Sequence, residues 1–280
     1  MAILPHNSPL LDAAGQPLSS IRAINRLDEP EKDRIYSCLL PPRLREVLGV
    51  ADNALCNVAG ERLVTFIAPA GLPFIRIEAR SKPVGGVMAF FLELCDTQFH
   101  QMELSFCIIK DPGAASYAVD VNEKGENNWF ASHGRNIPEE LRAMKAGLFP
   151  NQTQQGLQLF VSFFPLLERF TDALGIEMIV AEPLTYDNAI RYEKYGFDYL
   201  RGTRLMREID REFQPGGRYF KRLDGSSPFR MPGMERSVIG RSWAIHDGIM
   251  DEPWDEVQIY RMIGKNAGIN TFPGREEKKR

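Results

Sequence analysis

The chain has 280 residues, a formal net charge of −3 and a pI of about 5.9. It therefore lacks the basic excess that is typical of proteins that bind nucleic acid or anionic membranes. No apolar run approaches the roughly 20 residues that span a bilayer, and polar residues interrupt the N-terminus where a signal peptide needs an apolar run. We expect a cytoplasmic protein with no nucleic-acid partner and no membrane partner.

The first third of the sequence predicts a short helix and then strands. Residues 31–40 form the expected helix, which Pro41 and Pro42 should stop. The strand-like segments after it are residues 62–68, 73–79, 102–110 and 115–122. The turn residues Asp-Pro-Gly at 111–113 predict that the last two pair as an antiparallel hairpin. Residues 84–95 stay ambiguous between strand and helix.

The second half alternates between helices and strands. Residues 142–149 are open between a short strand and a helix, since Pro-Glu-Glu at 138–140 is typical of a helix start. The further expected elements are a helix at 154–174 with Pro165 inside it, a strand at 176–181, a helix at 187–195 and a strand at 198–206. Residues 214–242 are basic and predict a solvated extension. Because a helix would join strands around Phe149 and Ile179, we expect those two to be parallel.

Two segments in this half carry the chemistry. Residues 148–158 (LFPNQTQQGLQ) place a polar loop with one glycine before an apolar helix. Helix N-termini expose unpaired N–H groups, and such a loop can cradle a pyrophosphate. In residues 189–197 (AIRYEKYGF), Gly196 suits the left-handed position after a helix. Phe197 should then pack on Tyr192 in a Schellman motif.

These two segments resemble the GNAT superfamily of N-acyltransferases. Residues 189–197 are similar to its A-I-x-x-Y-E-K-x-G-F signature, with one residue fewer after Ile190. Residues 148–158 are similar to its acyl-CoA loop, V-x-P-x-x-Q/R-x-x-G-x-G/A, in which Pro150 and Gly156 match. Gln158 stands where the family prefers glycine or alanine. The order of the segments, with one helix between them, adds to the resemblance.

The resemblance implies an α/β (α+β) fold with a mixed, mostly antiparallel sheet flanked by helices. A parallel strand pair would form the acyl-CoA cleft. Residues 71–210 would be the acyl-CoA-binding core. Residues 1–70 would be an N-terminal extension packed on it, and residues 211–280 a C-terminal extension.

The implied activity is transfer of an acyl group, most simply acetyl, from acetyl-CoA or another acyl-CoA to an amine by direct attack. The acceptor would be a small molecule or a peptide, and a homodimer is left open. Tyr192 would act as the general acid, since a phenol with a pKa near 10 can protonate the leaving thiolate. Glu182 is a candidate general base. The cofactor-binding residues would be Leu148, Phe149, Gln154, Gln155, Gly156, Leu157, Gln158 and Asn188.

Two other interpretations stay open. The protein could keep the fold as a catalytically degenerate ligand-binding or interaction module, or it could be an unrelated α/β fold that shares a glycine-capped helix. For Tyr192 the alternative to catalysis is packing alone. The cysteines and histidines show no metal-ligand spacing, so we expect no metal.

Overall fold

The computed structural model describes residues 8–51, 55–129, 131 and 133–273. This part of the chain folds as a mixed α/β protein with a seven-stranded sheet in the order β1-β2-β3-β4-β5-β7-β6. The strands are β1 (Val64–Ile67), β2 (Phe74–Arg80), β3 (Met88–Asp96), β4 (Met102–Ile109), β5 (Met178–Ala181), β6 (Asp198–Arg201) and β7 (Gln258–Met262). None of the helices in the described ranges is both long and apolar enough to cross a membrane.

The helices alternate with the strands in the second half of the chain. They are α1 (Ile21–Ile24), α2 (Glu29–Tyr36), α3 (Pro42–Leu48), α4 (Ile137–Lys145), α5 (Phe160–Ala173), α6 (Tyr186–Glu193), α7 (Thr203–Glu212), α8 (Arg218–Lys221) and α9 (Val238–His246). Two short 3-10 helices are η1 (Ser37–Leu39) and η2 (Met234–Arg236).

The sheet confirms the coarser part of the predicted fold class, a mixed α/β fold with a mostly antiparallel sheet and one parallel pair. β1, β2, β3 and β4 pair in antiparallel order, and β4 pairs with β5 in parallel. The predicted position of the parallel pair is wrong, however. The strand beside β5 is β4, and residues 146–159 form no strand.

The chain divides into two compact units, each assembled from segments that are distant in sequence. Unit 1 comprises Met1–Ala114, Gly156–Ala181 and Tyr260–Asn266. Unit 2 comprises Ala115–Gln155, Glu182–Ile259 and Ala267–Arg280.

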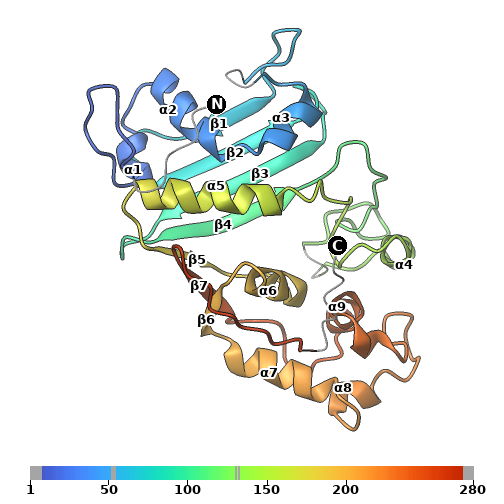
Figure 1. Ribbon diagram of the computed structural model, residues 1–280. Coiled ribbons are helices and arrows are strands. Elements are labelled where there is room, and N and C mark those ends of the chain that lie inside the picture. The colour runs from blue at the N-terminus through green and yellow to red at the C-terminus, as the bar shows by residue number, and fades with distance from the viewer. Residues whose placement is uncertain (1–7, 52–54, 130, 132, 274–280) are drawn as a thin grey trace. The chain divides into compact units, whose positions relative to one another are not determined.

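Unit 1 is built on the alternation of apolar residues along its strands. In β2, Ile75, Ile77 and Ala79 point to one face and are fully buried, because successive side chains of a strand point to opposite faces. Helices α1, α2, α3 and α5 cover this face (Figure 1). Phe163 of α5 meets Phe90 of β3 edge to face, with ring centroids 5.5 Å apart. Each fully buried side chain of this kind contributes about 1.5–3 kcal/mol to folding.

Helix α5 begins six residues later than predicted. Gln158 has a φ of 55°, a left-handed conformation that an α-helix cannot continue through, so residues 154–159 form a loop instead. The predicted end is confirmed, because Gly175 has a φ of 70° just beyond the last turn. Pro165 lies inside the helix, as the sequence predicts.

Two segments of unit 2 for which the sequence suggests a strand form other structure: residues 142–149, which the sequence leaves open between strand and helix, and residues 115–122. Residues 137–145 form α4, the helical alternative, with the Asn136 side chain accepting a hydrogen bond from the Glu139 N–H. The predicted hairpin at 102–122 is also wrong: β4 pairs with β3, and residues 115–120 form no strand. Val119 is instead buried in an apolar cluster that includes Ala143 of α4. Its side chain therefore packs in the core of this unit and not in a sheet.

The glycine-ended helix α6 matches the sequence prediction closely. Gly196 has a φ of 77°, and the Phe197 N–H donates to the Tyr192 carbonyl at 3.3 Å. The Gly196 N–H donates to the Glu193 carbonyl at 2.9 Å. These are the two hydrogen bonds of a Schellman motif, so this local prediction is confirmed.

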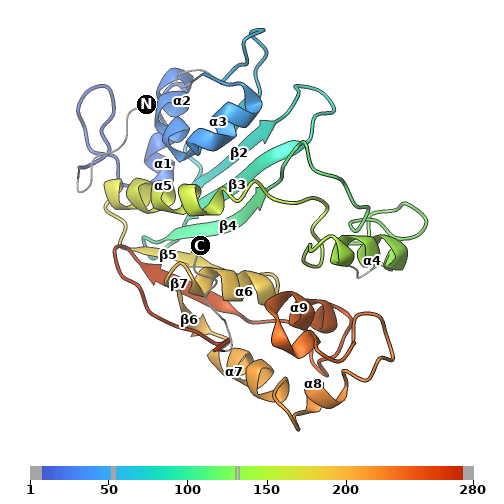
Figure 2. The same cartoon turned by 45° about the vertical axis from the view of Figure 1, so that its right-hand side comes forward.

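The region after α6 is more folded than predicted. The strand at 198 ends at Arg201, because Gly202 has a φ of 96° and Thr203 begins α7. The predicted solvated extension at 214–242 contains α8 and part of α9, with Tyr219, Leu223 and Phe229 buried. Figure 2 shows α9 next to α6, and α8 next to the end of α7.

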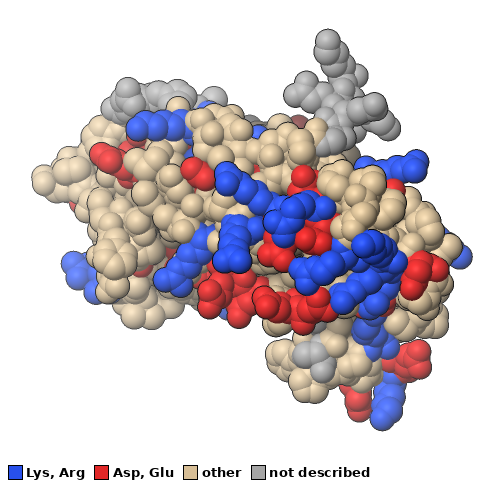
Figure 3. Space-filling model, turned by 90° about the horizontal axis from the view of Figure 1, so that it is seen from below, with Lys and Arg blue, Asp and Glu red and all other residues tan. Residues whose placement is uncertain are grey.

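The basic residues of this region are used in ion pairs. Arg218 pairs with Glu208 at 2.7 Å and with Asp251 at 3.1 Å, and Arg222 pairs with Asp251 at 2.7 Å. Arg241 pairs with Asp210 at 2.8 Å. On the face that Figure 3 presents, basic and acidic side chains are intermixed. These arginines therefore neutralise neighbouring carboxylates rather than form a separate basic patch.

Candidate functional site

The predicted acyl-CoA loop meets the end of β4 in unit 1. Gly156 lies so close to this strand that a Cβ atom built on it would stand 2.9 Å from the Ile109 carbonyl oxygen. Real Cβ atoms essentially never approach backbone that closely, so any side chain at this position would displace the loop or the strand. The glycine is required here by close approach rather than by its φ.

The same unit contains the parallel strand pair. Met102, Glu103 and Leu104 pair with Ile179, Val180 and Ala181. β4 then continues to Ile109, whereas β5 ends at Ala181. The crossover from β4 to β5 therefore brings the loop at 156–159 to the far end of β4 before α5 returns the chain to β5.

The loop leads into α5, and the N-terminus of this helix has no side-chain cap. Leu159 occupies the N-cap position of α5 and makes no side-chain hydrogen bond there. In α5 the Ser162 N–H already donates to the Leu159 carbonyl at 3.0 Å. Other backbone N–H groups at the start of a helix lie at the positive end of the macrodipole. A phosphate group is a suitable acceptor for them.

Gln158 lies next to this terminus in an unfavourable backbone conformation. Its φ of 55° falls in the left-handed region, which costs an L-residue other than glycine about 1–2 kcal/mol, and its side chain is exposed. Strained non-glycine residues cluster at functional sites. Glycine would suit this position, because it adopts the left-handed conformation without strain.

The earlier residues of the predicted loop lie in unit 2. Leu148 is buried, and its carbonyl accepts a hydrogen bond from Trp243 Nε1 at 2.9 Å. The Phe149 N–H donates to Gln152 Oε1 at 3.0 Å, and the Phe149 ring lies 5.9 Å from the Arg191 guanidinium carbon. Leu148 and Phe149 are thus part of the packing of this unit.

The two glutamines before Gly156 differ in exposure. Gln154 is buried. Gln155 is exposed, and its Nε2 donates to the Ala146 carbonyl at 3.4 Å. After them the chain passes into unit 1, where Leu157 is half-buried.

The residues predicted for catalysis lie on and beside α6, also in unit 2. The half-buried Tyr192 ring meets Phe197 edge to face, with centroids 5.0 Å apart. Glu182 is exposed, and its Oε1 accepts a hydrogen bond from Gln258 Nε2 at 2.6 Å. Asn188 is half-buried on α6. The ten predicted site residues thus divide between the units, with Gly156, Leu157 and Gln158 in unit 1 and the other seven in unit 2.

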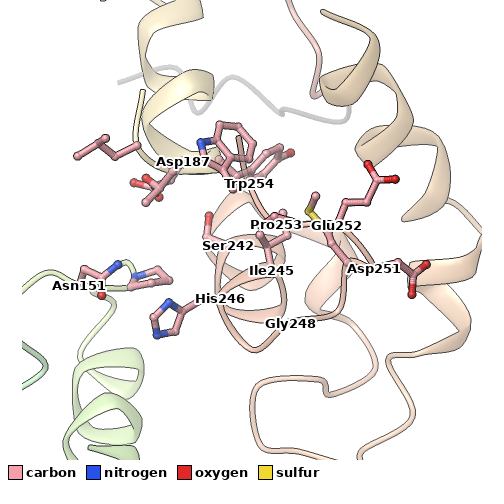
Figure 4. Close-up of a pocket in the computed structure, with 15 residues that line it drawn as sticks. Asn151, Asp187, Ser242, Ile245, His246, Gly248, Asp251, Glu252, Pro253 and Trp254 are labelled. Atoms are coloured by element: carbon pink, nitrogen blue, oxygen red, sulfur yellow. Dashed lines mark hydrogen bonds between the residues drawn. The ribbon is translucent and has the colours of Figure 1, made fainter. Parts of the chain in front are cut away.

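Unit 2 also contains a cavity that the sequence did not predict. Its volume is about 560 Å³, and none of the ten predicted residues is in its lining. Figure 4 shows Asp187 and Trp254 on one side of it and His246 extending from α9 toward Asn151 on another. Carboxylate, imidazole and aromatic groups therefore share one cavity.

Asp187 is the most buried carboxylate of the cavity wall. Thr185 Oγ1 donates to its Oδ1 at 2.8 Å, and Arg191 lies 3.7 Å from its Oδ2. Burial raises the pKa of Asp187, against the opposing effects of Arg191 and the Thr185 hydroxyl. Burial likewise raises the pKa of the neighbouring Tyr186 to about 12, with the charge of Arg241 opposing it.

The His246 imidazole contacts a buried carboxylate, that of Glu140. Its Nε2 lies 3.3 Å from Glu140 Oε1, and Arg135 pairs with the same carboxylate. Arg135 also bonds Asp247 at 2.7 Å. Burial alone would raise the pKa of Glu140, but the hydrogen bonds from His246 and Arg135 outweigh it and keep the pKa below its usual value. Glu140 therefore stays ionised and orients the imidazole.

We predict that Asp187→Asn raises the melting temperature at pH 7. A raised pKa in the folded state means that the native protein binds this proton more tightly than the unfolded chain, so the charged form costs stability at neutral pH. Asparagine keeps the oxygen that accepts from Thr185 and removes the charge. The gain should shrink as the pH is lowered toward the ordinary aspartate pKa of about 3.9, where the wild-type group is neutral too.

Thermal melts of both proteins between pH 4 and pH 8 test this sign. A lower melting temperature for Asp187→Asn at pH 7 would show instead that the ionised carboxylate stabilises α6 through Arg191 and the helix dipole.

The sequence offered little signal for this cavity. Glu140 and His246 are 106 residues apart, and neither belongs to a short motif. Among the described residues, no group of three or more His, Cys, Asp or Glu side chains could hold a metal ion. No family model, no curated protein and no solved structure matches this chain.

Proposed function

We propose that this protein binds acetyl-CoA or another acyl-CoA in unit 1 and transfers the acyl group to an amine. The observation that carries the proposal is the 2.9 Å approach of a Gly156 Cβ position to the Ile109 carbonyl. It places a glycine loop at the end of β4, directly before the helix that leads to the parallel partner β5. The resemblance of residues 148–158 and 189–197 to the GNAT superfamily supports the same function.

In this proposal the cofactor uses backbone groups of unit 1. The pyrophosphate is bound by N–H groups of the loop at 156–159 and of the first turn of α5, where the macrodipole favours negative charge. The pantetheine arm runs along β4 beyond Leu104, where the pairing with β5 stops. Gly156 lets this loop pack directly against the Ile109 carbonyl at the end of β4.

The chemistry is a direct transfer without a covalent acyl-enzyme. The acceptor nitrogen attacks the thioester carbonyl carbon, and the carbon–sulfur bond then breaks. The departing thiolate takes a proton from the Tyr192 phenol, and the attacking amine loses its proton to Glu182 or to water. The role of Tyr192 follows from the family resemblance. Glu182 is a candidate base, beside Glu103 and water, because it follows the carboxyl end of β5 directly.

A binding module without activity is the second candidate. Two observations favour it: Gln158 is bulky where close approach is expected, and the Tyr192 ring is already used in packing on Phe197. Such a protein would bind acyl-CoA or a related ligand and leave the thioester intact.

Two substitutions in the loop test the cofactor site, because only one of them should weaken acetyl-CoA binding. Gly156→Ala should weaken binding about tenfold or more, since its Cβ must displace the loop or β4; a tenfold loss is about 1.4 kcal/mol. Gln158→Gly should preserve or improve binding, because glycine tolerates the left-handed conformation and clears the approach to the helix. Calorimetric titration of the full chain measures both.

Gly113→Ala is the matched control. This glycine is also in unit 1, and a Cβ on it would meet only the Asp111 side chain, at 3.4 Å. It should leave the affinity unchanged. Equal affinities for Gly156→Ala and the wild type would place the acyl-CoA site elsewhere.

A further inference from the structure

Three of the polar donors in the wall of the unit 2 cavity already donate to protein acceptors. Thr185 Oγ1 donates to Asp187, and Ser242 Oγ donates to the Val238 carbonyl at 2.7 Å. Trp254 Nε1 donates to the Pro183 carbonyl at 2.9 Å. A ligand in this cavity therefore gains little from being an acceptor of these three groups.

The remaining polar wall is rich in acceptors. Three carboxylates line the cavity, at Asp187, Asp251 and Glu252, and among the lining residues there is no Lys or Arg. Asp251 is neutralised by Arg218 and Arg222. Arg191 lies 3.7 Å from Asp187 Oδ2, which is beyond hydrogen-bonding distance. The cationic partners of Asp187 and Asp251 thus lie outside the lining, and the wall itself presents carboxylates to the cavity.

The apolar part of the wall is aromatic. The rings of Tyr186 and Trp254 meet edge to face with centroids 6.4 Å apart, and both residues line the cavity. Aromatic faces attract organic cations, with tryptophan the best of them.

We propose that this cavity binds a small organic ammonium ion with an apolar body. The ammonium group donates hydrogen bonds to the Asp187 carboxylate, and the apolar body packs against Trp254 and Tyr186. The volume of about 560 Å³ suits a small molecule, since ligand pockets typically measure about 300–1,000 Å³. The inference goes beyond acyl transfer and does not depend on it, because no residue of the proposed acyl-CoA site lines the cavity.

The buried carboxylate of Asp187 also has a purely structural explanation, and the experiment must distinguish it from ligand binding. It lies in the first turn of α6, where a carboxylate complements the helix dipole without any ligand. Such a purely structural carboxylate would not distinguish a cationic ligand from a neutral one of the same shape.

Calorimetric titration of the full chain at neutral pH with 2-phenylethylamine and with 2-phenylethanol makes this distinction. The two probes share their body and differ in the charge of one terminal group. We expect saturable binding of the amine and at least tenfold weaker binding of the alcohol. Asp187→Asn should weaken binding of the amine at least tenfold and leave binding of the alcohol unchanged.

The control variant is Glu123→Gln, because Glu123 is an exposed carboxylate of unit 2 that does not line the cavity. It should bind both probes as the wild type does. Trp254→Leu, which keeps an apolar side chain, should also weaken binding of the amine about fivefold or more. This variant still tests the site if Asp187→Asn does not fold. Absence of amine binding, equal binding of the two probes, or wild-type amine affinity in the Asp187 variant would overturn the proposal. Acetyl-CoA affinity, measured on the same samples, reports the proposed function separately.

Discussion

Replacing Trp243 with alanine should lower the free energy of unfolding by about 3–5 kcal/mol. This side chain is fully buried on α9, and its ring stacks on Phe229 with centroids 5.1 Å apart. Its Nε1 donates a buried hydrogen bond to the Leu148 carbonyl. The substitution therefore leaves a large cavity and an unpaired carbonyl in the apolar cluster of unit 2.

Chemical denaturation of three variants separates the contribution of the packed ring from that of the hydrogen bond. Trp243→Phe keeps an aromatic ring on Phe229 and loses the hydrogen bond, so it should cost about 1–3 kcal/mol. Trp129→Ala is the matched control, because Trp129 is 64% exposed, and it should change stability by less than about 0.5 kcal/mol. If Trp243→Ala were no worse than Trp129→Ala, this cluster would not be the core of unit 2.

Replacing Tyr192 with phenylalanine should lower kcat about 10²–10⁴-fold if the phenol is the general acid. The change removes only the hydroxyl and keeps the ring that packs on Phe197. The melting temperature and the acetyl-CoA affinity should therefore stay close to those of the wild type. Release of the CoA thiol from acetyl-CoA, first by slow hydrolysis and then with a panel of amines, supplies the readout.

Tyr192→Ala completes the comparison, because it removes the ring as well. If Tyr192 only packs, the phenylalanine variant should turn over at the normal rate, and the alanine variant should lose stability. Normal turnover by Tyr192→Phe would therefore remove the general-acid role and leave the Schellman motif unaffected.

The sequence predicts best where one local rule decides the structure. The alternation in β2 identified its buried face, because Ile75, Ile77 and Ala79 follow the two-residue period of a strand. Gly196 and Phe197 identified the end of α6, because the left-handed position after a helix favours glycine. Both features depend on neighbours within a few residues.

The predictions failed where distant segments decide the structure. Val119 alternates with polar residues as in a strand, yet it is buried against α4. The parallel partner of β5 lies more than seventy residues earlier in the chain, at β4, and the region between them contains both α4 and α5. The cavity of unit 2 is likewise assembled from three separate segments, so no local pattern revealed it.

Hydrogen exchange of the full chain with and without acetyl-CoA tests the central claim most directly. We expect slower exchange at the amides of residues 156–162, in the loop and the first turn of α5, and along β4 at residues 105–109. The protection should be lost in Gly156→Ala and retained in Gly113→Ala. Unchanged exchange in both segments at millimolar acetyl-CoA, or protection confined to other segments, would contradict it.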